Sequence, residues 1–404
     1  FYKGLLDKIG VEAQFEWAGK YKSAVEPMTR NNASDAEKEQ TNEMLKDFYS
    51  TISTAITSSR KIKDSELKTI IDTMPIINST DAKDLKLIDQ TGHYDEIGKI
   101  AAKFLNKKGK LPLVEISKRN YIKYNWSDDS KIAIINASGT IIEGSSTRDL
   151  FSGETTLGAD TIAELLDRAR KDESVKAVVF RIDSGGGSAL ASDIIAREIS
   201  RYKEAKKPIV VSMANVAASG GYWVATDADK IIANSSTVTG SIGVFTGKMS
   251  FSKLFNNLGI NAESFKIGEH ADAFSESRAF TEEEKKILQN SVQTLYRLFL
   301  ERVSSGRKIQ IAKVEEIAQG RVYSGKKAKE LNLIDDVGGL EKAIEIAKEL
   351  AQLKDKKVKT FNMKDELASL GKTNINPLQA FYPLILMNLI KENRVLAIMP
   401  NFEY

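Results

Sequence analysis

The chain has 404 residues, of which 42% are hydrophobic and 28% charged, and it contains 26 glycines and 7 prolines. This globular composition predicts two or three domains, and it excludes a collagen, a disordered tail and a low-complexity scaffold. The 59 basic and 55 acidic residues are well mixed, so the net charge of +4 indicates no nucleic-acid-binding stripe. No apolar run reaches the roughly 18–20 residues of a membrane span.

The predicted elements alternate between helices and strands. A helix is expected from about Ser34, and beyond residue 130 short β-branched runs predict buried strands separated by turns and helices. This order predicts an α/β fold with parallel strands covered by helices. The later elements are a strand from Lys131, a helix at 163–170, a strand at 176–182, a helix at 189–203, strands at 208–213 and 230–233, and a long helix with Thr281 as its N-cap.

An internal repeat organises the chain. The sequence from Tyr2 is echoed from Phe251, with Gly10 matching Gly259 and Gly19 matching Gly268, each 249 positions apart. The matches keep their order over about 90 residues, so we treat them as a true repeat. The second copy extends backwards through 131–250, which the first copy lacks. We therefore expect the chain to start inside its first repeat; a naturally half-sized first repeat is the alternative.

The repeat predicts four regions. Residues 1–105 form the C-terminal half of the first repeat, 106–127 are a linker rich in lysine and turn residues, and 128–350 form the complete second repeat. Residues 351–404 are a tail whose apolar stretch, 380–390, is too short to span a membrane. We expect that stretch to make a packing or oligomer contact, with a membrane-surface contact as the lesser alternative.

Cysteine and histidine usage narrows the chemistry. With no cysteine, the chain has no disulfide, thiol nucleophile or cysteine-bound metal. Its two histidines, His93 and His270, are too few for a zinc site built from several histidines. A Ser-His-Asp enzyme would have to use one of them, and His93 is expected in a surface turn.

Two turns rich in small residues follow neighbouring predicted strands. In 184–188 (SGGGS), three glycines allow a sharp turn, and the helix after it directs N–H groups that suit a phosphate or an oxyanion. No Gly-Lys-Ser/Thr follows, which excludes a P-loop; a purely structural turn is the alternative. In 217–223 (AASGGYW), Ser219 opens a helix, either as a nucleophile or only as an N-cap. The two turns would face one cleft, one with a nucleophile and the other with an oxyanion donor.

A serine nucleophile needs a base. One candidate is His270, with Asp272 close enough in sequence to orient it. The other is Lys22, which the repeat aligns with Ala271 because 22 plus 249 is 271, so that only one copy keeps the lysine. An ordinary surface lysine is the alternative. Lysine titrates near 10.4, so its use as a base at neutral pH requires burial.

Four motifs together resemble a known family. They are SGGGS from Ser184, NVAASGGYW with Ser219, VTGSIGV with Ser241 and GKYKSAVEP with Lys22. This set resembles the long, two-repeat form of the signal peptide peptidase SppA (protease IV) family over nearly the whole chain. The resemblance implies tandem ClpP/crotonase-like α/β repeats with parallel sheets and covering helices. It also implies a serine endopeptidase that degrades apolar peptides, such as remnant signal peptides after export.

The resemblance implies a role for each matching residue. Ser219 matches the nucleophile, Lys22 the general base of a Ser-Lys dyad, and Ser241 a serine that orients the lysine. Gly186 matches an oxyanion-hole glycine, and the N–H of Gly220 is the expected second donor. No metal or organic cofactor is required.

Expectations for substrate, partner and location follow as well. Family members form homo-oligomeric rings, a tetramer in the long form, and lie on the outer side of the bacterial cytoplasmic membrane through an anchor that this sequence lacks. Substrate contacts are expected from Gly187, Tyr222 and Val244, with Trp223 and Phe245 as further pocket candidates and core packing as their alternative.

Three other functions stay open. A crotonase-like acyl-CoA enzyme would use a similar oxyanion hole without needing Ser219 or Lys22. A catalytically silent scaffold would result if Lys22 could not reach Ser219. A hydrolase with His270 and Asp272 as its base would dispense with Lys22.

Overall fold

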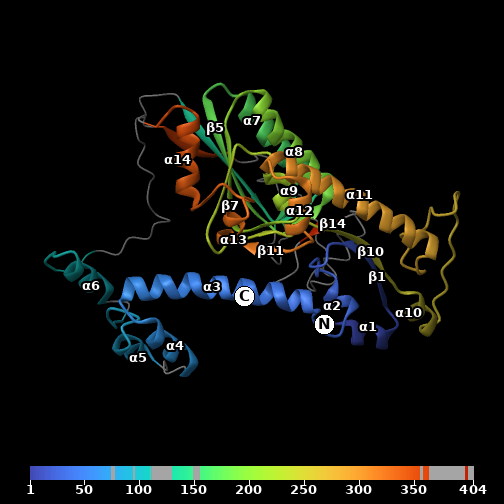
Figure 1. Cartoon of the computed structure of the whole chain (residues 1–404), viewed down its shortest axis with the longest axis horizontal. Coiled ribbons are helices and arrows are strands. Elements are labelled where there is room, and N and C mark those ends of the chain that lie inside the picture. Colours follow the sequence, from blue (N-terminus) through green and yellow to red (C-terminus); the bar gives the residue numbers. More distant parts are fainter. Residues whose placement is uncertain are drawn as a thin grey trace. The chain divides into compact units, whose positions relative to one another are not determined.

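The computed structural model describes residues 1–73, 78–93, 96–109, 111, 130–148, 155–354, 358–363 and 396–398 (Figure 1). The chain divides into two compact units: Phe1–Asp47 together with Asp128–Tyr404, and Phe48–Ser127. Most of the expected linker, and the apolar stretch at 380–390, lie outside the described residues.

The first 47 residues join the unit that begins at Asp128 because they share a sheet with it. Strand β1 (Glu12–Ala18) pairs antiparallel with β10 (Val244–Ser250), in a register that sets Glu12 opposite Ser250 and Ala18 opposite Val244. The segment that carries Lys22 and the segment that carries Ser219 therefore belong to one unit.

A mostly parallel sheet forms the centre of this unit, as the strand pattern predicts. Strands β2, β5, β7 and β9 run parallel, and β11 closes one edge antiparallel to β9. The predicted strand at 230–233 is β8, which lies beside β7 and pairs with β12. The sheet order is β11 (Val322–Ser324), β9 (Val238–Gly240), β7 (Ile209–Ala218), β5 (Val175–Ser184), β2 (Lys131–Ser138) and β13 (Lys359–Met363), with β8 (Lys230–Ala233) and β12 (Asp336–Val337) beside that path.

Helices cover both faces of this sheet (Figure 1). Successive residues of a strand point to opposite faces, and the core follows that alternation. Val178 and Phe180 of β5 join one apolar cluster, whereas Ala177 and Val179 join another. The first cluster packs under α7 (Ala159–Lys171), α8 (Ala189–Glu204) and α9 (Gly220–Ala225), and the second under α14 (Leu340–Leu350).

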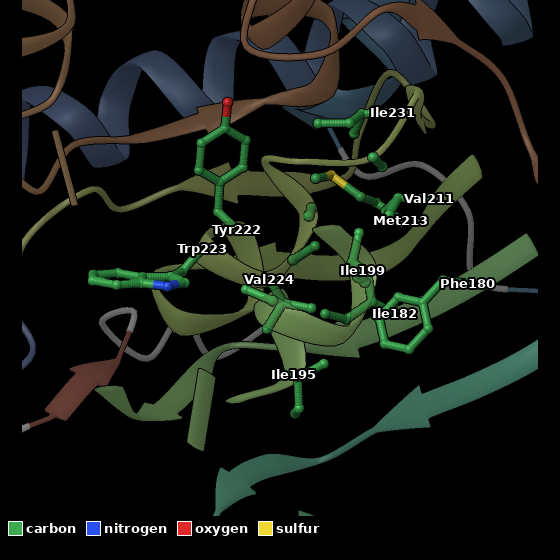
Figure 2. Close-up of a cluster of buried hydrophobic side chains, with 14 of the residues drawn as sticks. Phe180, Ile182, Ile195, Ile199, Val211, Met213, Tyr222, Trp223, Val224 and Ile231 are labelled. Atoms are coloured by element: carbon green, nitrogen blue, oxygen red, sulfur yellow. The ribbon is translucent and has the colours of Figure 1, made fainter. Parts of the chain in front are cut away.

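Figure 2 shows the larger cluster. Ile195 and Ile199 of α8 and Val224 of α9 lie against side chains of β5 and β7, such as Ile182 and Met213. This packing fixes the ends of β5 and β7, where the two small-residue turns begin.

The first of these turns differs from its prediction. Residues Gly186–Ser188 form a short strand, β6, which pairs parallel with β3 (Thr140–Ile142). Gly187 makes this approach possible, since a Cβ on it would meet the Ile141 carbonyl oxygen at 2.0 Å. The last three residues of the predicted turn therefore form a strand instead.

A second sheet carries β6. Its order is β1, β10, β14 (Leu396–Ile398), β6, β3 and β4 (Thr156–Gly158). Strand β14 pairs antiparallel with β6, with Leu396 opposite Ser188 and Ile398 opposite Gly186, and Leu396 also lies opposite Phe245 of β10. The segment 396–398 thus fills the gap between β6 and β10.

Several described helices stand at matching positions of the predicted repeat. The helices α3 (Asp35–Arg60) and α11 (Glu282–Arg307) both have 26 residues. The remaining counterparts are α1 (Lys3–Ile9) with α10 (Ser252–Asn257), α4 (Asp64–Thr73) with α12 (Ile311–Ile317), and α5 (Ser79–Asp84) with α13 (Gly325–Glu330), while α2 (Glu26–Thr29) and α6 (Ile97–Phe104) complete the described helices.

The predicted N-cap of α11 is confirmed. The Thr281 hydroxyl accepts a hydrogen bond from the Glu284 N–H at 3.1 Å, and the Glu284 carboxylate accepts one from the Thr281 N–H at 2.8 Å, which is a capping box. Among the described residues, no helix combines the length and apolar composition needed to cross a membrane.

Candidate active site

Lys22, Ser219 and Ser241 meet in the interior of the unit. The Lys22 Nζ lies 2.8 Å from the Ser219 Oγ, 3.1 Å from the Ser241 Oγ and 3.2 Å from the Ser241 carbonyl oxygen. All three residues are buried, with at most 2% of their surface exposed. The β1–β10 pairing explains the meeting, because it brings the chain just before Lys22 against the chain just after Ser241.

Ser219 adopts a strained backbone conformation. Its φ of 54° and ψ of −119° lie in a region that residues with a side chain rarely adopt. The residue joins β7 to α9, its N–H donates to the Gly240 carbonyl at 2.8 Å, and its carbonyl accepts from the Trp223 N–H at 2.8 Å. Its side chain makes no capping hydrogen bond, so the Oγ is directed to Lys22 instead. This arrangement is unlike that of a simple N-cap serine.

Ser241 is held beside Ser219 by the sheet. Strands β7 and β9 run parallel, with Ala218 opposite Gly240, so the residues that follow them leave the sheet together. Ser241 also has a positive φ, 50°, and its N–H donates to the Arg321 carbonyl at 2.7 Å. Its hydroxyl and its carbonyl both contact the Lys22 amine, which fixes the direction of the lysine side chain.

Burial sets the protonation of Lys22. Removal from water disfavours the ammonium form, which holds the pKa of Lys22 well below its usual 10.5. The hydrogen-bond partners of its Nζ are two hydroxyls and a carbonyl, which carry no compensating negative charge. The environment therefore favours the neutral amine, the form that can accept a proton.

The two small-residue turns lie next to each other, as predicted. Strands β5 and β7 are parallel neighbours, and Ser184 lies opposite Ala217 at their ends. Gly221 needs to be glycine here, because a Cβ on it would lie 2.6 Å from the Ser184 carbonyl oxygen. The helix that starts after Ser219 thus packs directly on the turn that leads to Gly186.

The two candidate oxyanion donors have different surroundings. Gly186 has a φ of 108°, and its N–H donates to the Ser184 Oγ at 3.1 Å. Gly220 is the first residue of α9, a position whose N–H has no partner within the helix. Both glycines are buried.

The expected peptide contacts separate into strand and core residues. Gly187 lies in β6, opposite Ala397 of β14. Val244 starts β10, and its side chain is part of the core. Tyr222 is fully buried, and its hydroxyl donates to the Leu333 carbonyl at 2.8 Å, which leaves it no surface for a peptide. Phe245 is a core residue as well, whereas Trp223 belongs to the core and also lines a cavity beside β6.

A cavity of about 790 Å³ opens beside β6. Arg302 lies in its wall and donates to the carboxylates of Asp193 at 2.8 Å and Asp227 at 2.7 Å. Glu143 accepts a hydrogen bond from the Ser188 hydroxyl at 3.0 Å. The apolar part of the wall comes from Ala189, Leu190, Trp223, Leu295 and Leu298.

The structure does not bring His270 and Asp272 together as a catalytic pair. The His270 Nδ1 lies 3.4 Å from the Glu284 carboxylate, while the Asp272 carboxylate bonds to Arg278 and Lys266. Asp272 therefore does not orient His270, and of the two candidate bases it is Lys22 whose amine lies within hydrogen-bond distance of Ser219. His93 is exposed, as expected for a turn residue. No group of three His, Asp or Glu side chains within the described ranges is arranged to hold a metal ion.

Sequence reasoning missed the residues that hold the Lys22 turn. The Tyr21 N–H donates to the Gln319 carbonyl at 2.7 Å, and the Gln40 side chain donates to the Tyr21 carbonyl at 3.2 Å. Gly320 lies so close that a Cβ on it would be 2.7 Å from the Lys22 backbone nitrogen. The only sequence signal for these contacts was the repeat, which relates the two segments without predicting that they touch.

A sequence model of peptidase family S49 matches residues 1–108 and 201–354. The chain belongs to peptidase family S49. This is a serine protease family, and the expected resemblance is confirmed. The matched residues include Lys22, Ser219 and Ser241, whereas Gly186 lies outside them.

This S49 chain is similar to two curated proteins. It is 35% identical over 363 residues to "Serine protease SPPA, chloroplastic" of Arabidopsis thaliana, covering 87% of the chain and 53% of that protein. It is 35% identical over 379 residues to "Protease 4" of Haemophilus influenzae, covering 90% and 60%. The chain thus spans a little over half the length of these relatives. A solved ClpP1 structure from Listeria monocytogenes, 13% identical, covers 52% of the chain and 94% of its own with a TM-score of 0.34, too low to support a conclusion.

Proposed function

We propose that this chain is a serine endopeptidase that cleaves extended apolar peptides with a Ser219–Lys22 dyad. The observation that carries the proposal is the 2.8 Å contact between the buried Lys22 Nζ and the Oγ of a serine in a strained backbone conformation. A crotonase-like acyl-CoA enzyme would need neither residue, so this contact favours the peptidase.

The proposed reaction begins with proton transfer. Neutral Lys22 accepts the Ser219 hydroxyl proton as the Oγ attacks the scissile carbonyl, and Ser241 keeps the Nζ aimed at the Oγ. The tetrahedral intermediate then collapses, the C–N bond breaks, and the leaving amine takes the proton from Lys22. Water attacks the resulting ester while Lys22 accepts its proton, and the acid product leaves as Ser219 recovers its hydrogen.

The oxyanion is proposed to bind the N–H groups of Gly186 and Gly220. Since the Gly186 N–H donates to the Ser184 Oγ in this structure, that hydroxyl must give up its place to the oxyanion. Gly220, at the first position of α9, offers its N–H without a competing intrahelical acceptor. One such donor is worth about 10²–10³ in kcat in other acyl-transfer enzymes.

The substrate is proposed to bind as an added strand between β6 and β10. Strand β14 occupies that gap and pairs antiparallel with both neighbours, which supports an extended backbone as the ligand. In this arrangement Gly187 and Val244 contribute their backbones and no side chain. The leucines of the neighbouring cavity favour apolar side chains, as in remnant signal peptides.

Assembly and location are proposed from the family resemblance alone. A homo-oligomeric ring and a place on the outer side of the bacterial cytoplasmic membrane would suit an enzyme that removes peptides left by export. Size-exclusion chromatography with light scattering measures the first, and cell fractionation the second.

The test is the cleavage of an apolar reporter peptide by the unmodified chain, Ser219→Ala and Lys22→Ala. We expect each variant to lose at least about 10³-fold in kcat while it still unfolds cooperatively on heating. A mass increase equal to the acyl group, seen on Ser219 and absent in Ser219→Ala, would identify the covalent intermediate. Full activity of Lys22→Ala would contradict the dyad, and binding of a CoA thioester without peptide cleavage would favour the crotonase-like alternative.

A further inference from the structure

The residue before the base is held at both of its backbone polar groups. The Tyr21 N–H donates to the Gln319 carbonyl at 2.7 Å. The Tyr21 carbonyl accepts from the Gln40 Nε2 at 3.2 Å. Because Lys22 follows Tyr21 directly, these two bonds fix the starting point of the lysine side chain.

Gln40 reaches further than this one bond. Its Nε2 lies 3.0 Å from the Ser23 Oγ, and its Oε1 accepts from the Val322 N–H at 3.3 Å. The side chain, on α3, is 1% exposed, and the Glu37 carboxylate bonds to both Gln40 and Ser23. One amide therefore joins the turn 21–23 to strand β11.

Strand β11 is also the support of Ser241. Val322 lies opposite Gly240, the residue before Ser241, and the Arg321 carbonyl accepts the Ser241 N–H at 2.7 Å. Gln40 thus connects the two segments whose side chains meet at the Lys22 Nζ.

We propose that Gln40 is a positioning residue for the reaction, whose amide fixes the Lys22 turn against β11 and so sets the Lys22–Ser219 contact. This inference rests on the proposed function. Gln40 touches none of the reacting atoms and acts through Tyr21 and Ser23.

The chemistry of the site selects glutamine. A carboxylate could not donate to the Tyr21 carbonyl, and a lysine or arginine could not accept from the Val322 N–H. An apolar side chain would leave these buried groups without partners. A neutral amide satisfies both sides without placing a charge next to the buried amine.

Loss of Gln40 is expected to make the surroundings of Lys22 more favourable to its ammonium form. The charged groups around its turn include Glu37, Glu39 and Glu43 on α3, Lys20 beside Tyr21, and Arg321 before β11. A loosened turn admits water and lets Lys22 approach Glu37, and both changes favour the ammonium form. The pKa of Lys22 then rises, so the lost activity returns as the pH is raised.

The experiment compares Gln40→Ala with Asp47→Ala. Asp47 lies on the same helix and accepts from the Ser324 hydroxyl of β11, so its removal weakens the α3–β11 contact without touching the Lys22 turn. Two quantities are measured against pH: kcat and KM for the reporter peptide, and acetylation of Lys22 by acetic anhydride, read by peptide mass spectrometry. If Gln40→Ala does not fold, Gln40→Met keeps the length of the side chain.

For Gln40→Ala we expect kcat to fall about 10–100-fold at pH 7, with KM within about twofold. The kcat ratio to the unmodified chain should recover as the pH rises, and the midpoint of Lys22 acetylation should move up by about one pH unit. Asp47→Ala should leave the midpoint of Lys22 acetylation unchanged, and its kcat ratio to the unmodified chain should not vary with pH. This should hold even if its melting temperature falls as much as that of Gln40→Ala.

The inference is overturned if the acetylation midpoint of Gln40→Ala equals that of the unmodified chain, or if Asp47→Ala moves it as far. The acetylation readout does not need catalysis. A shifted midpoint in a chain that cleaves no peptide would therefore sustain the positioning of Lys22 and reject the proposed function. An unshifted midpoint in a Gln40→Ala variant of an active peptidase would reject the positioning role of Gln40 and leave the proposed function standing.

Discussion

The Nζ of Lys22 lies 2.8 Å from the Oγ of Ser219, although 197 positions separate the two residues in the sequence. In the predicted repeat alignment, Ala271 stands at the position of Lys22. The β1–β10 ladder brings Lys22 and Ser219 together. A site divided between two distant segments depends on the packing between them as much as on the residues themselves.

The first prediction concerns the pH dependence of activity. A base must be deprotonated to act, and burial holds the pKa of Lys22 well below 10.5. We therefore expect kcat/KM to be lost as the pH falls through this lowered pKa and to be constant above it. The measurement is kcat/KM of the reporter peptide from pH 5 to 10.

His270 provides the control for this profile, because it is the other candidate base in the sequence. His270→Ala should leave both the rate and the position of the limb unchanged. A limb that disappears in this variant would assign the base to His270, and a limb near 10.5 would contradict the burial of Lys22.

The second prediction concerns stability. In the unfolded chain Lys22 titrates near its ordinary pKa, whereas folding lowers it, so the unfolded state binds more protons between the two values. Stability should therefore rise with pH across that window, by up to about 1.4 kcal/mol per pH unit from this group. Lys22→Met, which keeps most of the volume, should remove that rise. The measurement is the urea unfolding free energy from pH 6 to 10.

Lys20→Met is the matched control, because Lys20 is exposed and two positions away. It should keep the slope of the unmodified chain. Equal slopes for the unmodified chain and Lys22→Met would show that the buried amine contributes no proton linkage.

The third prediction concerns Gly187. Its φ is 158°, and a Cβ would lie 2.0 Å from the Ile141 carbonyl oxygen, so alanine must push β6 away from β3. We expect Gly187→Ala to cost about 2–3 kcal/mol of unfolding free energy and to raise KM, because β6 forms one side of the peptide gap. Gly259→Ala, with a φ of 70° and no atom within 4 Å of the added Cβ, tests backbone strain alone and should cost about 1–2 kcal/mol. If both variants lose the same unfolding free energy and Gly187→Ala has an unchanged KM, then β6 is not part of the peptide site.

Much of the architecture could be predicted from local pattern. The strands at 176–182 and 230–233, the helix at 189–203 and the N-cap at Thr281 follow from short-range preferences, and the structure has them within a few residues. Glycine-rich turns and a mismatch between the repeats make Ser219 and Lys22 candidates, but only the family resemblance assigns them as nucleophile and base. Their 2.8 Å contact agrees with that choice.

The rest depends on contacts between distant segments. No local pattern reveals which side of α9 faces the core. The sequence therefore offers Tyr222 for a peptide pocket, whereas its hydroxyl donates to the Leu333 carbonyl in the core. Gln40 looks like any polar residue of an amphipathic helix, and its importance arises only when Tyr21 and Val322 are brought to it. The positive φ of Ser219 is likewise imposed by its neighbours, since serine has no preference for it.

The last prediction concerns β14. Leu396–Ile398 occupies the gap between β6 and β10 in which a substrate is proposed to bind, so a peptide must displace it. Ala397→Pro removes an N–H from the centre of this strand and should weaken its pairing with Gly187. We expect KM to fall several-fold with kcat unchanged, because the chemistry at Ser219 is not altered while the competing strand is lost.

Deletion of residues 396–404 should have the same effect and tests it without introducing a proline. A substitution to valine at Ala397 keeps the backbone N–H and serves as the control, with an unchanged KM. If both the deletion and Ala397→Pro raise KM, then β14 helps to build the peptide site instead of competing for it, and the gap between β6 and β10 would have to accept its substrate alongside this strand.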